Sequence, residues 1–246
     1  MNLVVLDMEQ HDFTSNCQLL LFSEQFPENR RGRPTPEQYE ALARVRLSKH
    51  YILRDFLFST ECAARGLSNY PEDPDMVIRA GKALCEKLLE PIRERWGHVI
   101  TTFGYQSRED IEWGWSKGRR EANRHSSSPH MWDRKCWGEA IYARCDILPI
   151  CVEDGEVSKH EFGHWLMHSL DLDLCMMWRR SNVFCLTISP RPRRVWVLWG
   201  NPQIGEPKQE MLMGATYWRE VYPYLPEDQR PKFGPSCTGG RMQWRE

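Results

Sequence analysis

The sequence has no long hydrophobic run, no CxxC pair and almost no net charge, and each absence excludes a class of protein. No stretch reaches the roughly 18 apolar residues that a membrane-spanning helix needs, and the opening MNLVVLDMEQHDF lacks the basic and apolar regions of a secretory signal. The nine cysteines are an odd number without CxxC spacing. We therefore expect a soluble, cytoplasmic protein whose cysteines are reduced.

The charge balance argues against a dedicated nucleic-acid-binding protein. The 33 Lys and Arg residues are matched by 34 Asp and Glu residues, so the formal net charge is −1. Affinity for nucleic acid depends on neutralising phosphates with basic side chains. Small arginine clusters at 119–120 and 191–194 leave a local basic patch open. No Gly-x-Ser-x-Gly motif is present, so a serine nucleophile has no support. Nothing in the sequence indicates an oligomeric state.

The chain of 246 residues, 41% of them hydrophobic and eleven of them Trp, predicts one α+β domain with extensions at both ends. A helix is expected from Thr35, which can cap it, and a longer one over 73–97, where apolar residues recur every three or four positions. We expect a largely irregular loop over 106–130, because it is polar and rich in Gly and Ser. Strands are predicted at 98–105, 182–189 and 193–200. The predicted domain organisation is an N-terminal extension at 1–46, a domain at 47–200 and a Pro- and aromatic-rich tail at 201–246.

Three segments between Leu47 and Asp110 resemble the peptidase M15 family, which contains zinc D-Ala-D-Ala carboxypeptidases and related endolysins. They are LSKHYILRDFLFSTECAARGLSNYP, LLEPIRERWG and ITTFGYQSRED, and their order and spacing are similar to those of the family over roughly sixty residues. The resemblance implies the M15 (D-Ala-D-Ala peptidase/hedgehog-like) fold. It also aligns 164–178 with a helix that precedes the last strand of the family.

The same resemblance implies a zinc site. The family motif Ser-x-His-x(2)-Gly-x-Ala-x-Asp is present in stretched form, with Ser128, His130 and Asp146 in the right order; unstretched spacing would put Tyr142 at the Asp position. In the later strand VFCLTIS, Cys185 takes the place of the last family histidine. The implied zinc ligands are therefore His130, Asp146 and Cys185, and a thiolate is chemically acceptable to zinc.

The resemblance further implies the substrate and the reaction. Gln106 takes the place of the family arginine that holds the substrate carboxylate, and Ser107 and Arg108 follow it as further substrate-binding candidates. The expected activity is hydrolysis of a short peptide or a peptidoglycan stem peptide by zinc-activated water. The alternative is a divergent M15-like scaffold that binds a partner or ligand without peptidase activity, since three family positions have changed.

A second alternative rests on HEFGHWLMH, residues 160–168, which contains the HExxH pattern of zincin proteases. On a helix, His160 and His164 lie one turn apart and can share a zinc ion, with Glu161 as the general base. Glu161 is also the catalytic carboxylate predicted for the M15-like site. Phe162 and its apolar neighbours fall on the opposite side of this helix, so its histidines are equally typical of a solvent-exposed face.

Overall fold

The computed structural model describes residues 34–117, 128–134, 142–190, 192 and 194–200, and the backbone of 209–212. Within these ranges the chain is α+β: helices pack on one mixed sheet around a single core. The helices are α2 (Pro36–Ala43), α3 (Arg54–Leu57), α4 (Thr60–Arg65), α5 (Pro74–Leu84), α6 (Glu90–Trp96), α7 (Arg108–Ser116), α8 (Ile150–Glu153) and α9 (Lys159–Ser169). None of these helices has both the length and the apolarity to cross a membrane.

The sheet has six strands in the order β1-β2-β4-β3-β5-β6. All neighbouring strands are antiparallel except β3 and β5, which are parallel. The strands are β1 (Val99–Phe103), β2 (Ala143–Pro149), β3 (Leu174–Trp178), β4 (Phe184–Ile188), β5 (Val195–Trp199) and β6 (Gln209–Leu212). Successive residues of a strand point to opposite faces of a sheet, so strands β1 to β5 divide their side chains between a helix-covered face and a second face.

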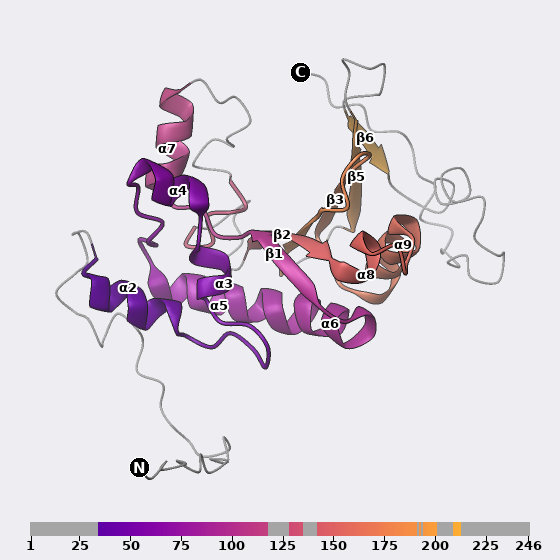
Figure 1. The fold of residues 1–246 in the computed structure, drawn as a ribbon, viewed down its shortest axis with the longest axis horizontal. Coiled ribbons are helices and arrows are strands. Elements are labelled where there is room, and N and C mark those ends of the chain that lie inside the picture. The colour runs from indigo at the N-terminus through magenta and orange to yellow at the C-terminus, as the bar shows by residue number, and fades with distance from the viewer. Residues whose placement is uncertain are drawn as a thin grey trace, which may run out of the picture.

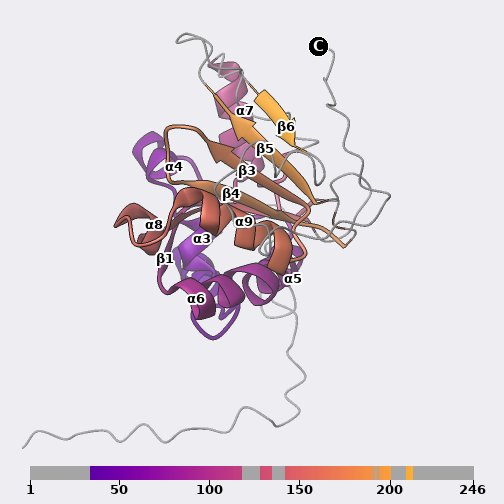
Figure 2. The same cartoon turned by 90° about the vertical axis from the view of Figure 1, so that its right-hand side faces the viewer.

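The helix-covered face of the sheet carries the core. Helices α5, α6 and α9 lie on the same side of the sheet (Figures 1 and 2). The ring of Phe162 in α9 packs against that of Phe184 in β4 at 4.8 Å between centroids. Gly163 brings α9 so close to β5 that a Cβ there would lie 2.9 Å from the Trp196 ring. The absence of a side chain at Gly163 therefore sets how closely the helix approaches the sheet.

A wide π-helical turn at Cys85–Leu89 joins α5 to α6, so that one continuous helical segment runs from Pro74 to Trp96. Asp73 caps the start by accepting a hydrogen bond from the Met76 N–H, and Gly97 follows the end. Leu84, Leu88 and Ile92 are fully buried at intervals of four residues. These residues form the side of the segment that packs into the core.

Several predicted elements are confirmed, among them the capped helix after Thr35, the helix over 73–97 and strands β1, β4 and β5. Helix α2, in the predicted N-terminal extension, buries Leu42 in the core. The predicted loop over 106–130 is wrong for Arg108–Ser116, which form α7: the Ser107 hydroxyl caps it, and Ile111 is buried. Helix α7 lies beside α4 (Figure 1), where the Arg65 guanidinium stacks 4.0 Å from the Trp113 ring.

The helix expected over 164–178 is also wrong in its second half. Helix α9 ends at Ser169, and Leu174–Trp178 form strand β3, which pairs with both β4 and β5. The first 33 residues and the part of the stretched motif between residues 135 and 141 lie outside the described residues, and so does the predicted tail at 201–246 apart from 209–212.

Candidate metal centre

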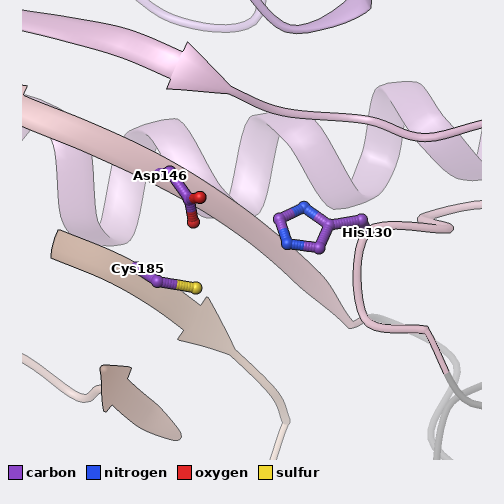
Figure 3. A group of neighbouring side chains, drawn as sticks. All are labelled: His130, Asp146 and Cys185. Carbon is purple, nitrogen blue, oxygen red and sulfur yellow. The ribbon is translucent and has the colours of Figure 1, made fainter. Parts of the chain in front are cut away.

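Three side chains of metal-binding type converge on the second face of the sheet. They are His130 from the segment 128–134, Asp146 from β2 and Cys185 from β4, and we refer to them as the His–Asp–Cys group (Figure 3). One donor atom of each lies within 4.8 Å of the others. His130 and Cys185 are buried and Asp146 is partly buried, so the group lies at the edge of the protein interior. A group of this composition could hold a metal ion.

The register of the sheet positions two of the three residues. Asp146 in β2 and Cys185 in β4 are directly opposite each other in an antiparallel pair. Opposed residues of such a pair point to the same face, with Cβ atoms about 5 Å apart. Their chain neighbours Cys145 and Phe184 point the other way and belong to the core. The carboxylate and the thiol are therefore held side by side by the backbone.

The segment 128–134 brings His130 to this face, and a buried Trp anchors the segment. Trp132 is fully buried against Phe56, and its indole N–H donates to the Arg144 carbonyl of β2 at 3.0 Å. One residue on, the Asp133 carboxylate accepts from the Tyr105 hydroxyl at 2.9 Å. The His130 carbonyl itself accepts from a backbone N–H at 2.9 Å. These bonds fix a segment that has no regular secondary structure.

A backbone carbonyl fixes the orientation of the His130 ring. The Nδ1 atom of His130 lies 2.8 Å from the Gly104 carbonyl oxygen, and since a carbonyl only accepts, Nδ1 carries the proton. The other nitrogen, Nε2, then carries the lone pair, and it is on the side of the ring that faces Asp146 and Cys185 (Figure 3). Phe103 packs edge-on against the ring, with centroids 4.7 Å apart. Histidine ligands of metals are commonly oriented in this way.

Burial changes the protonation of all three residues. It lowers the pKa of His130 to about 3, with the nearby Arg144 guanidinium acting in the same direction and hydrogen bonds to the backbone of Gly104 and Arg144 opposing it. It raises the pKa of Asp146 to about 6, partly offset by the hydrogen bond from the Cys185 thiol and by Arg144. It raises the pKa of Cys185 well above its ordinary value. In the absence of a metal ion at neutral pH, the group therefore has a neutral imidazole, an ionised carboxylate and a neutral thiol.

The donors fit a metal ion in chemistry and nearly in spacing. In a tetrahedral site with bonds of about 2.0–2.3 Å, neighbouring donors are roughly 3.5 Å apart. The three donor atoms lie within 4.8 Å of one another, so the distances between them would have to shorten by about 1 Å on metal binding. The Asp146 Oδ1 atom is buried and has no hydrogen-bond partner within the described residues. Because a buried carboxylate oxygen without a partner is costly, a cation at this position would satisfy it.

Arg144 is a fourth notable residue beside the group, and the sequence analysis missed it. It is 8% exposed, and its Nε donates to the Thr187 hydroxyl at 2.9 Å. Arg144 lies two residues before Asp146, and Thr187 two residues after Cys185, so all four point to the same face of the sheet. A prediction of β2 as a strand would have identified this neighbour from the sequence.

The predicted substrate-binding residues lie at the start of α7 and have partners of their own. The Gln106 amide donates to the Asp110 carboxylate at 2.7 Å. Ser107 is buried, and its hydroxyl accepts from the Asp110 N–H. Arg108 forms an ion pair with Glu72 at 3.1 Å. Tyr142, at the unstretched motif spacing, donates its hydroxyl to Asp173, so the group contains Asp146 instead of Tyr142.

The HExxH segment forms helix α9, on the opposite side of the sheet from the His–Asp–Cys group. Its histidines at 160, 164 and 168 are partly buried, so they form neither a fully exposed face nor part of the core. The rings of His164 and His168 are 4.4 Å apart. Glu161 is exposed in the first turn, and the structure does not bring it to the His–Asp–Cys group. Within the described residues, no third acidic, His or Cys ligand joins His160 and His164.

Comparisons with known proteins identify no relative of this chain. A scan of family models, a search of curated proteins and a search of solved structures each found no match to the chain. The geometry of the His–Asp–Cys group is therefore the observation on which a function has to rest.

Proposed function

We propose that the protein is a metal-dependent hydrolase of the M15 peptidase type, which binds zinc through the His–Asp–Cys group and acts on a short peptide or a peptidoglycan stem peptide. One observation carries the proposal: donors from His130, Asp146 and Cys185 converge within 4.8 Å. Three protein ligands and an open fourth position are typical of catalytic zinc sites. Zinc bound there would lower the pKa of a water molecule towards about 7.

The surrounding residues support this role by fixing the ligands. The Gly104 carbonyl holds His130 in the tautomer that presents Nε2, and the β2–β4 register holds Asp146 beside Cys185. Such supporting contacts set the orientation and basicity of metal ligands. The chain order of the ligands, first a segment before a strand, then that strand and then a later one, is also the order that the M15 resemblance implies.

The test is the zinc content and the activity of purified protein, compared for the wild type, His130→Ala, Cys185→Ser and the control His164→Ala. We expect about one zinc per chain in the wild type and the control and far less in the other two variants. Hydrolysis of a D-Ala-D-Ala-terminated stem peptide, followed by release of D-Ala, should be lost together with the zinc. Zinc loss in His164→Ala alone would point to the HExxH helix instead, and no zinc in any sample would overturn the proposal.

A second candidate function is favoured by a specific observation. Within the described residues, no further Asp, Glu, His or Cys joins the His–Asp–Cys group, and Glu161 lies across the sheet from it. Hydrolysis by metal-activated water normally uses a carboxylate or histidine as proton acceptor. A metal-containing scaffold that binds a partner or ligand without peptidase activity needs no such residue. Stoichiometric zinc without stem-peptide hydrolysis would support this candidate.

A further inference from the structure

Arg144 is a buried positive charge that no carboxylate of the described residues contacts directly. It is 8% exposed, and the Thr187 hydroxyl is the only hydrogen-bond partner of its guanidinium in the described part of the chain. No carboxylate there forms an ion pair with it. A buried charge is costly unless it is paired and hydrogen-bonded. The exposed arginines at 44, 54 and 194 all have carboxylate partners, whereas the buried Arg144 has no ion pair with the described residues.

The direction of Arg144 connects this charge to the His–Asp–Cys group. Arg144 and Asp146 are alternate residues of β2, and their opposed residues in β4 are Thr187 and Cys185. Alternate residues of a strand share a face, so the guanidinium lies on the face that carries the metal-binding donors. The Nε–Thr187 bond uses one of the five N–H groups of the guanidinium. The remaining donors belong to its two terminal nitrogens, which are the pair that recognises a carboxylate or phosphate.

The total charge around the His–Asp–Cys group also favours an anionic ligand. A divalent ion held by a neutral His130, an ionised Asp146 and a Cys185 thiolate has a total charge of zero, since 2 − 1 − 1 = 0. The guanidinium of Arg144 adds one positive charge, which raises the total to +1. The centre is largely buried, where charges are weakly screened. A centre with one excess positive charge would favour an anionic ligand over a neutral one.

We propose that Arg144 and the His–Asp–Cys group together form a binding site for a small oxyanion group, a carboxylate or a phosphate, carried by the substrate or ligand. This inference rests on the proposed metal centre and names the chemical class that the centre takes. Two N–H groups of Arg144 bind the oxyanion, and Thr187 holds the guanidinium by its Nε. The site selects against neutral isosteres, because a neutral group leaves the arginine charge unmatched.

The test measures binding of three probes by titration calorimetry: inorganic phosphate, acetate and the neutral isostere acetamide. The wild type is compared with Arg144→Gln, which removes the charge, and with Arg79→Gln, the same substitution at an exposed arginine. We expect phosphate or acetate to bind the wild type and the control alike, and Arg144→Gln about 10- to 100-fold more weakly. Acetamide should bind much more weakly than either anion. Whichever anion binds more tightly identifies the group.

Zinc is quantified in each sample, so that failure of the metal centre and failure of the inference are distinguishable. Anion binding is measured on zinc-loaded and on metal-free protein, and the comparison of the wild type with Arg144→Gln is made for both. Equal anion affinity in the wild type and Arg144→Gln, or acetamide binding as tight as acetate, overturns the inference while a bound zinc leaves the proposed function intact. If Arg144→Gln does not fold, Arg144→Lys decides: it keeps the charge but not the paired donors, so a loss of about threefold or more is expected, and unchanged affinity overturns the inference.

Discussion

Metal binding to the His–Asp–Cys group should release a characteristic number of protons, and this number follows from the pKa values of the three residues. A metal ligand must be deprotonated, so every proton that the free group carries is released on binding. Cys185 is a neutral thiol across the neutral range, because burial raises its pKa well above the ordinary value. Cys185 should therefore contribute about one proton at any pH between 6 and 8.

The pH dependence of the release comes from Asp146, and the histidine does not contribute to it. With a pKa of about 6, Asp146 adds about 0.5 proton at pH 6 and almost none at pH 8. His130, whose pKa is lowered to about 3, adds none above pH 5. The expected totals are about 1.5 protons at pH 6 and about 1.0 at pH 8. A site built on His160 and His164 without a thiol would release almost no protons at pH 8.

Calorimetric titration with zinc measures this release when it is repeated in two buffers of different ionisation enthalpy. Cys185→Ser should lose about one proton of the release at both pH values, along with most of the affinity. His164→Ala is the matched control and should leave the release unchanged. A release below about 0.5 proton at pH 8 in the wild type would refute the reasoning, since it would mean that no buried thiol enters the site.

Four further predictions concern stability. Gly163→Ala should lower the free energy of unfolding by about 1–3 kcal/mol in urea denaturation, because its Cβ would lie 2.9 Å from the Trp196 ring. Asn69→Ala should lower it by about 2–4 kcal/mol, since the buried Asn69 side chain bonds two backbone carbonyls and one backbone N–H. Lys159→Met should cost about 1–3 kcal/mol, because the Lys159 amine binds three carbonyls at the β3–β4 connection. Metal-free protein should lose stability as the pH falls from about 6.5 towards 3. The reason is that His130 takes up its proton at the ordinary pKa in the unfolded chain, but only near a pKa of about 3 in the folded protein. The substitution His130→Gln should remove this part of the pH dependence.

The outcomes that contradict these predictions are specific. A change below about 0.5 kcal/mol for any of the first three substitutions would mean that the contact does not contribute as the packing indicates. Asp146 makes an opposing contribution to the pH dependence, because its raised pKa makes the folded state lose stability as the pH rises from about 4 to 6. Comparing the wild type with His130→Gln separates the contribution of the histidine from that of Asp146. Identical pH profiles for the two proteins would contradict the lowered pKa.

The sequence predicts those parts of the fold whose signals are local. The helix after Asp73 has a capping residue, a regular apolar spacing and a terminating Gly97, and each of these features is readable from a few neighbouring residues. Strand β3 was missed because LCMMW is a short apolar run directly after a helix, and periodicity does not distinguish a buried strand from a helix in such a run. Its pairing with both neighbours decides its structure, and that pairing is not local.

In the candidate metal centre, too, some residues could be predicted from the sequence and others could not. His130, Asp146 and Cys185 were predicted together through a family resemblance that covers their order in the chain, and the structure brings them into one group. Arg144 was missed because its relevance depends on a sheet face, and a face exists only once β2 and β4 are paired. Helix α7 was missed because its capping serine precedes a polar sequence, and its contacts to α4 are what bury one side of it.

The π-helical turn at Cys85–Leu89 has a consequence for how this chain tolerates changes in length. An α-helical turn closes its hydrogen bond over four residues and a π-helical turn over five, so this turn contains one residue more than a regular helix needs. A one-residue deletion in an ordinary helix rotates everything after it by about 100°. Deleting Glu86, which is exposed, would instead leave a regular helix with Leu84 and Ile92 still on the same side. The middle of the segment from Pro74 to Trp96 is therefore a point at which the chain accommodates an inserted residue without redesign of the core.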